Sequence, residues 1–227
     1  MIETLKTKMK SISYKSRKRF SEDEMFLRSK VFYKMMEVRR SVRKFSSKKI
    51  PRRVIENIIK TAGTSPSGAN CQPWRFVVVS NPEIKHLIRI EAEKIEKENY
   101  EKRFTNELKN AIKPLGTDWH KEFLETAPYL IVVFQIIYNE NDSQRKKNYY
   151  VKESVGIAVG ILITAIHNAG LFALTYTPSS MRFLNKILNR PKNEKPFMII
   201  PTGYSSYDIE IPDIKRKTLD EISIFIE

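Results

Sequence analysis

The chain has 227 residues, of which 41% are hydrophobic, 11% aromatic and 30% charged. This length and balance exclude a peptide hormone, a disulfide-stapled miniprotein and a disordered chain, and they predict a folded protein with a sizeable core. Lys and Arg total 41 against 26 Asp and Glu, a net charge of +15, so the surface will attract anions.

Basic residues crowd the first 19 positions, which hold seven Lys and Arg residues and one acid, Glu3. The stretch lacks the aromatic interleaving of a base-stacking surface, so its composition favours a solvated arm over a nucleic-acid-binding element. We therefore predict a basic, disordered arm over residues 1–19 and a single domain over residues 20–227, since no composition shift divides the rest.

Cysteine and histidine are scarce in this sequence. Cys71 is the only cysteine, which excludes an intramolecular disulfide and a cysteine-based metal site and fits a reducing compartment. A nucleophilic thiol needs a basic partner, and a small packed thiol is the simpler interpretation. No two of His86, His120 and His167 share a helical turn, so we expect no metal.

Two stretches bear on localisation. Residues 1–20 lack the apolar core of a secretory signal. The most apolar run, Val155 to Ala169, is shorter than the roughly 20 residues of a membrane span and reads as a buried helix. We expect a cytoplasmic protein with no membrane partner.

The first predicted elements are two helices and a loop. Ser21 and Glu24 form a capping box ahead of apolar residues at helical spacing, which predicts a helix over 22–38. Pro51 at a first-turn position and Gly63 as a stop bound a second amphipathic helix. Residues 64–73, rich in Ser, Pro, Gly and Asn, predict a loop.

Strands and helices alternate through the rest of the chain, which favours an α/β or α+β layer architecture. In chain order we predict a strand at 74–79, a helix at 83–104, a strand at 128–134, a buried helix at 154–168 ended by Gly170, a strand at 171–176, a short helix at 181–188 and a strand at 197–201.

Two clusters carry candidate chemistry. Arg39-Arg40-Ser41-Val42-Arg43 places three guanidinium groups and a hydroxyl in five residues, a set that can hold a phosphate monoester. By composition alone, it is more simply a solvated basic turn. The loop Ser65–Asn70, followed by Gln72-Pro73-Trp74, offers backbone N–H groups and side-chain amides, and Gly68 permits close approach of a flat ligand. Alone, it is an ordinary turn.

Together, these motifs resemble the nitroreductase superfamily of FMN-dependent oxidoreductases, which has an Arg-x-Ser-x-Arg phosphate turn and a P-S-x-x-N-x-Q-P-W loop. The similarity extends over nearly the whole chain after Phe20, through the segments 168–171, 201–204 and 213–217. The resemblance implies an α+β nitroreductase fold with a central mixed or antiparallel sheet flanked by helices, an intertwined homodimer, and an FMN in each of two interface sites.

Within the superfamily, the chain is most similar to the iodotyrosine deiodinases. The segments that carry this similarity are Thr61–Thr64, Glu96–Ala127 with its ending Thr117-x-Trp119-x-Lys121-Glu122, and Thr175–Pro178. Asn70-Cys71-Gln72 departs from the His-Thr-Glu typical of the animal enzymes, and we expect no N-terminal membrane anchor like that of the animal enzymes. We therefore expect a microbial-type enzyme.

The resemblance assigns a cofactor set. Thr177 matches the threonine whose hydroxyl bonds flavin N5, which favours one-electron steps over hydride chemistry and makes Thr177 the catalytic residue. The cofactor-binding residues by this resemblance are Arg39, Arg40, Ser41, Val42, Arg43, Pro66, Ser67, Gly68, Asn70, Thr175, Tyr176, Thr177 and Arg216.

The resemblance also assigns a substrate set. Glu96, Tyr100 and Lys121 match a lid that grips the zwitterion of an amino acid, and Ala69 matches the position whose N–H meets the substrate phenolate. Glu96 and Tyr100 lie at i and i+4 on one helix face, where Glu can take an ammonium while Lys121 takes a carboxylate. The residues alone favour a charged, solvated helix.

The implied reaction is reductive dehalogenation of halotyrosines to tyrosine and halide, with electrons from NAD(P)H directly or through a reductase. The alternative is a generic nitroreductase or quinone reductase, which would lack convergence of Glu96, Tyr100 and Lys121. A rival of another class, a nucleic-acid-binding protein driven by the charge, would show steep salt dependence and no flavin.

Overall fold

The computed structural model describes residues 19–141, 144–207 and 209–227. Contacts divide the chain into two units, Met1–Val38 and Arg39–Glu227. Helix α1 (Glu22–Glu37) belongs to the first unit, and the single domain over residues 20–227 stays a prediction. The predicted basic arm lies outside the described residues except for Arg19.

Helix α1 follows its capping signal. The Glu24 N–H donates to Ser21 Oγ at 3.2 Å, and the Glu24 carboxylate pairs with Arg28 at 3.0 Å. None of the helix residues is buried. Large apolar side chains that α1 leaves more than half exposed are Met25, Phe26, Leu27, Val31, Phe32 and Tyr33.

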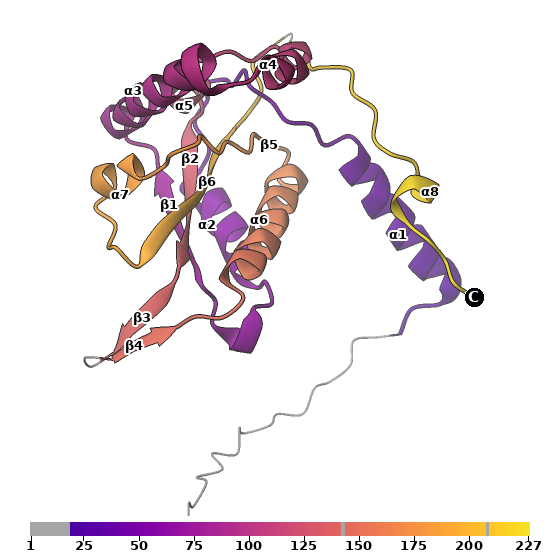
Figure 1. Ribbon diagram of the computed structural model, residues 1–227. Coiled ribbons are helices and arrows are strands. Elements are labelled where there is room, and N and C mark those ends of the chain that lie inside the picture. Colours follow the sequence, from indigo (N-terminus) through magenta and orange to yellow (C-terminus); the bar gives the residue numbers. More distant parts are fainter. Residues whose placement is uncertain (1–18, 142–143, 208) are drawn as a thin grey trace, which may run out of the picture. The chain divides into compact units, whose positions relative to one another are not determined.

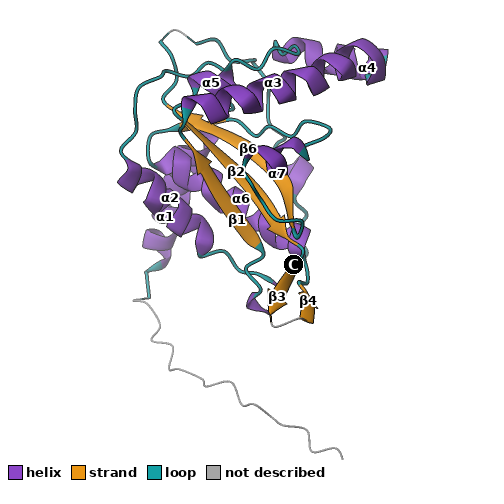
Figure 2. Cartoon of the chain, turned by 90° about the vertical axis from the view of Figure 1, so that its left-hand side faces the viewer, coloured by secondary structure: helices purple, strands orange, loops and turns teal. Residues whose placement is uncertain are grey.

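A four-stranded antiparallel sheet forms the centre of the second unit, in the order β1-β2-β6-β5 (Figure 1), and Figure 2 shows β1, β2 and β6 of this sheet. The segment before α2 adds a parallel bridge between Ser41 and Ala173 at the β5 edge. This sheet confirms the predicted fold class. Its strands are β1 (Trp74–Val79), β2 (Tyr129–Ile136), β5 (Phe172–Ala173) and β6 (Glu194–Gly203).

Helices cover both faces of this sheet, and strand β2 serves both. Its residues Leu130, Val132 and Phe134 join the core under α3, α5 and α7. Ile131 and Val133, which point the other way, join the core under α2 and α6. The helices are α2 (Arg52–Gly63), α3 (Pro82–Glu98), α5 (Phe123–Thr126), α6 (Val151–Asn168) and α7 (Phe183–Ile187).

Several elements escaped sequence prediction. The helix expected over 83–104 ends as an α-helix at Glu98 and continues as a single π-helical turn, η2 (Asn99–Arg103). The hairpin of β3 (Tyr138–Asn141) and β4 (Gln144–Lys147) is too polar to show an alternating apolar pattern. Short helices add to these: η1 (Gly68–Asn70), α4 (Asn106–Ile112), η3 (Lys113–Leu115) and α8 (Leu219–Ile222).

Helix α6 was predicted to be buried, and one face of it is. Val155, Leu162 and Ile166 are fully covered, whereas Gly156 and Ile157 are exposed. By length and composition this is the one described helix that could cross a membrane, a test that core helices also pass. Gly170 follows in the left-handed region at φ 73° and ends the helix.

Candidate functional site

The arginine cluster forms an extended segment along the sheet edge. The Val42 N–H donates to the Ala173 carbonyl at 3.3 Å, and the Val42 side chain is buried in the core. Because side chains alternate along extended backbone, Arg39, Ser41 and Arg43 share the side opposite Val42. Pairing with the sheet therefore aims two guanidinium groups and a hydroxyl the same way.

Arg216 joins this segment from the C-terminal part of the chain. Its Nη2 donates to the Arg39 carbonyl oxygen at 2.6 Å, and the Arg40 guanidinium donates to the Pro212 carbonyl. Burial, together with the positive charges of Arg216 and Arg40, lowers the pKa of Arg39. Such a concentration of positive charge fits a dianionic phosphate, the group that FMN carries.

A cavity of about 340 Å³ borders these residues. Ser41 and Arg43 line it together with Gly116 and Pro212. The phosphate turn expected from the sequence therefore faces a hollow rather than open solvent alone, and the chemistry of its donors fits FMN.

The loop before β1 has an unusual backbone. Ala69, Asn70 and Gln72 adopt φ values of 49°, 52° and 46°, in the left-handed region that non-glycine residues rarely enter. Hydrogen bonds within the loop hold this conformation: the Gln72 N–H donates to Ser67 Oγ at 2.9 Å, and Gln72 Nε2 donates to Asn70 Oδ1 at 3.2 Å. Backbone strain of this kind is common at ligand sites.

Gly68 in this loop is required by a neighbour that the sequence did not indicate. A Cβ atom at position 68 would lie 2.5 Å from Cδ2 of Tyr150, and the Gly68 N–H donates to Ser154 Oγ at 3.4 Å. The glycine thus allows the loop to pack against the start of α6. We expected it to admit a flat ligand, and its tight contact in the structure is this one.

The two predicted cofactor clusters lie at opposite ends of α6 (Figure 1). Gly68 contacts Ser154 at the start of the helix, while Arg39 and Arg40 border a small hollow with His167 at its end. Those ends are roughly 20 Å apart at the rise of an α-helix. One chain therefore does not bring the loop at residues 66–70 to the arginine cluster.

The segment that carries Thr175, Tyr176 and Thr177 runs beside β6. Tyr176 exchanges two backbone hydrogen bonds with Ile199, both of 2.9 Å. The Tyr176 side chain is buried, whereas the two threonines are exposed on the other side of the segment. The backbone of Tyr176 thus lies in the predicted cofactor segment, but its side chain points toward α3.

The predicted lid residues meet beneath that helix. Glu96 and Lys121 are 7% and 3% exposed, and the Tyr176 hydroxyl donates to Glu96 Oε1 at 3.1 Å. The Lys121 Nζ lies 5.7 Å from the ring centroid of Tyr100 and 5.9 Å from that of Tyr176. The structure therefore brings Glu96, Tyr100 and Lys121 together, and the interpretation as a solvated helix face does not hold for Glu96, whose side chain is buried.

Backbone groups of the 117–121 segment hold this cluster closed. The Tyr100 hydroxyl donates to the Thr117 carbonyl at 3.1 Å, and the Lys121 ammonium donates to the Asp118 carbonyl and to Thr117 Oγ1. Burial lowers the pKa of Lys121, and the nearby carboxylate of Glu96 opposes that shift. Arg43 lines the same cavity as Pro114 and Gly116, just before Thr117, and its positive charge acts to lower the pKa of both Tyr100 and Lys121.

Sequence reasoning missed one polar residue here. Asn99 is buried in the π-helical turn, and its Nδ2 donates to Ser179 Oγ at 3.0 Å. It lies three residues after Glu96 on the same helix face, as Ser179 lies three after Tyr176. The sequence shows only an asparagine at that spacing, and it does not indicate that the side chain is buried.

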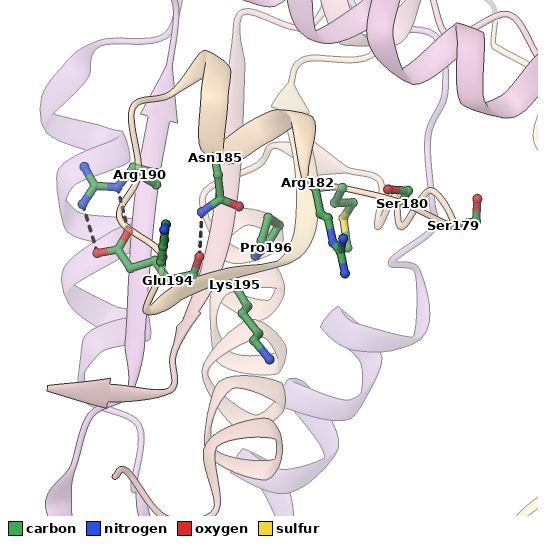
Figure 3. A pocket seen from close by; sticks show the side chains of 10 residues that line it. Ser179, Ser180, Arg182, Asn185, Arg190, Glu194, Lys195 and Pro196 are labelled. Atoms are coloured by element: carbon green, nitrogen blue, oxygen red, sulfur yellow. Dashed lines mark hydrogen bonds and ion pairs between the residues drawn. The ribbon is translucent and has the colours of Figure 1, made fainter. Parts of the chain in front are cut away.

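A second cavity of about 950 Å³ lies beyond Ser179 and Ser180 (Figure 3). In it, Arg190 turns toward Glu194 and donates to both carboxylate oxygens, at 2.6 and 2.9 Å. This ion pair between the half-buried Arg190 and the buried Glu194 links the two ends of the turn between α7 and β6. None of the predicted site residues lines this cavity, so we read it as part of the scaffold.

The nitroreductase family matches residues 36–204 of this chain. The chain belongs to the nitroreductase family. Its similarity to iodotyrosine deiodinases is high: it is 56% identical over 199 residues to that of Haliscomenobacter hydrossis, covering 87% of this chain and 90% of the relative. It is 45% identical over 213 residues to iodotyrosine deiodinase 1 of Homo sapiens, covering 93% and 74%. These relatives place it in the iodotyrosine deiodinase branch.

Solved structures agree with this placement. A crystal structure of oxidized iodotyrosine deiodinase bound to FMN and 3-iodo-L-tyrosine superimposes with a TM-score of 0.74 at 32% identity, covering 83% of this chain and 97% of the other. A BluB-like flavoprotein from Clostridium difficile superimposes with a TM-score of 0.66 at 21% identity, covering 86% and 98%, and shares the fold.

Proposed function

We propose that this chain is an FMN-dependent iodotyrosine deiodinase, which removes halide reductively from 3-iodotyrosine and related halotyrosines. The observation that carries the proposal is the cluster of the buried Glu96 and Lys121 with the half-buried Tyr100. An acid and a base held together with a phenol under one helix suit the zwitterion of an amino acid, and a general nitroreductase has no need of them. The relatives named above act as further support.

Two side chains bind the two charged groups of the substrate. Glu96 takes the α-ammonium and Lys121 the α-carboxylate, after the ammonium of Lys121 leaves the carbonyl oxygen of Asp118. Because both side chains are nearly covered, water screens their charges little, and the Coulomb attraction to the substrate charges is stronger than at an exposed site. The N–H of Ala69 serves as donor to the phenolate oxygen.

The same chain holds the cofactor. Arg39, Ser41, Arg43 and Arg216 bind the phosphate, and the exposed Thr177 offers its hydroxyl to the flavin ring. FMN, when bound, supplies the two electrons that the reaction consumes. The carbon–halogen bond breaks, halide leaves with its electron pair, and the ring carbon gains a proton, so that tyrosine and halide are the products.

A homodimer is part of this proposal. The loop at residues 66–70 lies at the far end of α6 from the arginine cluster, so a second copy supplies Pro66, Ser67, Gly68, Ala69 and Asn70 to each site. The exposed apolar residues of α1 and the exposed Ile157 of α6 support a partner of the same kind. Electrons come from NAD(P)H, directly or through a reductase, and the single cysteine supports a cytoplasmic location.

An anaerobic turnover experiment tests the activity. The flavin-loaded protein is reduced with dithionite and mixed with 3-iodotyrosine, and tyrosine released per bound flavin is measured. We expect tyrosine from the parent and from Lys94→Met, an exposed lysine of the same region, and at least tenfold less from Lys121→Met at low substrate. A yellow protein that releases no tyrosine would favour the generic nitroreductase.

A further inference from the structure

Tyr176 directs its hydroxyl at the carboxylate of Glu96. The two residues are 80 positions apart in the chain, yet the Tyr176 hydroxyl donates to Glu96 Oε1 at 3.1 Å, and both side chains are more than 90% covered. A carboxylate that is buried needs hydrogen-bond donors to stay charged. Tyr176 is the donor that the structure shows for this oxygen.

The ring of Tyr176 has little freedom to move. Its backbone is paired with Ile199 on β6, and its ring meets that of Phe123 edge-on, with centroids 5.4 Å apart and planes at 81°. The ammonium of Lys121 lies 5.9 Å from its centroid. Because sheet, aromatic neighbour and lysine all constrain the ring, the hydroxyl occupies a fixed position.

A fixed donor at Oε1 sets the rotation of the Glu96 carboxylate and hence the direction of its other oxygen. Burial and the neighbouring Glu96 charge raise the pKa of Tyr176, so the phenol stays a proton donor at neutral pH. The bond between Asn99 and Ser179, one turn along, clamps the same helix to the same segment. The carboxylate is therefore held before any ligand arrives.

We propose that Tyr176 is a positioning residue that orients Glu96 toward the α-ammonium of the substrate, and so sets the preference for halophenols that carry an ammonium group. The inference rests on the proposed function of the same site. It gives the side chain of Tyr176 a role toward the substrate, distinct from the cofactor contact expected of this segment.

Three ligands that differ in charge distinguish an orienting role of Tyr176 toward the ammonium from a general structural role. 3-Iodotyrosine carries both charges, 3-iodotyramine only the ammonium, and 3-(4-hydroxy-3-iodophenyl)propanoate only the carboxylate. In Tyr176→Phe, which removes only the hydroxyl, we expect binding of the first two to weaken about tenfold, as for loss of a hydrogen bond to a charged group, and binding of the propanoate to stay unchanged. Binding is measured by quenching of flavin fluorescence.

Tyr129→Phe is the matched control. The Tyr129 hydroxyl is also partly buried and donates to the Ile50 carbonyl at 3.3 Å, on the other face of the sheet. We expect this variant to bind all three ligands like the parent. We expect Glu96→Gln to weaken binding of the two ammonium-bearing ligands in the same way. Adding Tyr176→Phe to that variant should lower the affinity little further, because both changes act through one carboxylate.

The outcomes are distinct. Equal weakening of all three ligands in Tyr176→Phe, or loss of its flavin, would show a structural role and overturn the inference. Unchanged binding of 3-iodotyrosine would also overturn it, while the proposed function would stand. A parent protein that holds flavin but binds neither 3-iodotyrosine nor 3-iodotyramine would overturn both.

Discussion

Lys121 is held in a position that is unfavourable for its charge. Its side chain is 3% exposed, and burial lowers its pKa from the ordinary 10.5. Carbonyl and hydroxyl oxygens of the 117–121 segment, together with the two aromatic rings, offset part of that cost. The ammonium of Lys121 is therefore held in the site, where it can form an ion pair with a substrate carboxylate.

The lowered pKa of Lys121 predicts how binding depends on pH. Lys121 loses its proton at a lower pH than an exposed lysine, so affinity for the carboxylate falls on the alkaline side, below pH 10.5. Lys121→Arg keeps its charge, and we expect its alkaline loss to move to higher pH. Flavin-quenching titrations of the propanoate ligand from pH 7 to 10 measure this. Superimposable profiles for the two proteins would contradict it.

The hydroxyl of Thr177 allows a test of its predicted role in the reaction. It is exposed beside the buried Tyr176, where its hydroxyl is available to a ligand. We expect Thr177→Ala to slow halide release at least tenfold with flavin content unchanged, and Thr177→Ser to restore most of the rate, because serine keeps the donor. An alanine variant as fast as the serine variant would remove the hydroxyl from the mechanism.

Single residues also mark where sequence reasoning reached its limit. Glu96, Tyr100 and Lys121 were predicted to act together, and they meet in the structure. Tyr176 was predicted to bind the cofactor because it lies between Thr175 and Thr177, which the resemblance also assigns to the cofactor. Alternation along a strand would place Tyr176 on the face opposite Thr175 and Thr177, but the sequence does not indicate that this face meets Glu96, 80 positions earlier.

At the scale of elements, predictions succeeded where apolar periodicity was strong. The strand at 74–79 has the predicted bounds, and α2 and α6 each begin within a few residues of their predicted first residue. The π-helical turn was missed because its sequence, NYEKR, is as compatible with an α-helix. Asn99 is buried in this turn, and that burial is a tertiary feature that the local sequence does not show.

The end of α6 provides a prediction on stability. Gly170 has φ 73°, whereas Gly63 at the end of α2 has an ordinary φ, and a Cβ added at either position would meet no atom within 4 Å. We expect Gly170→Ala to lower the free energy of unfolding by about 1–2 kcal/mol, the cost of a left-handed alanine. Gly63→Ala should be neutral or slightly stabilising. Urea titrations of both variants measure the difference, and equal midpoints would contradict it.

For the whole molecule, the proposed dimer makes oligomeric state and flavin content rise and fall together. Replacing Phe26 and Val31 of α1 by Glu places two negative charges on its exposed apolar surface. We expect weaker dimers by light scattering and lower flavin content, since each site would lose the loop of its partner. Lys30→Glu changes the charge by the same amount on the same helix and should leave both unchanged. A monomeric double variant with full flavin content would contradict the shared site.

The position of strand β2 between two cores affects how the second unit unfolds. Its alternate side chains belong to two different cores, so neither core can lose its order while the other keeps this strand in place. We expect loss of structure in this unit to be all-or-none, with aromatic and helical signals lost at one temperature. Because Tyr176 packs in one of these cores, we expect the second unit to lose ligand binding in the same transition.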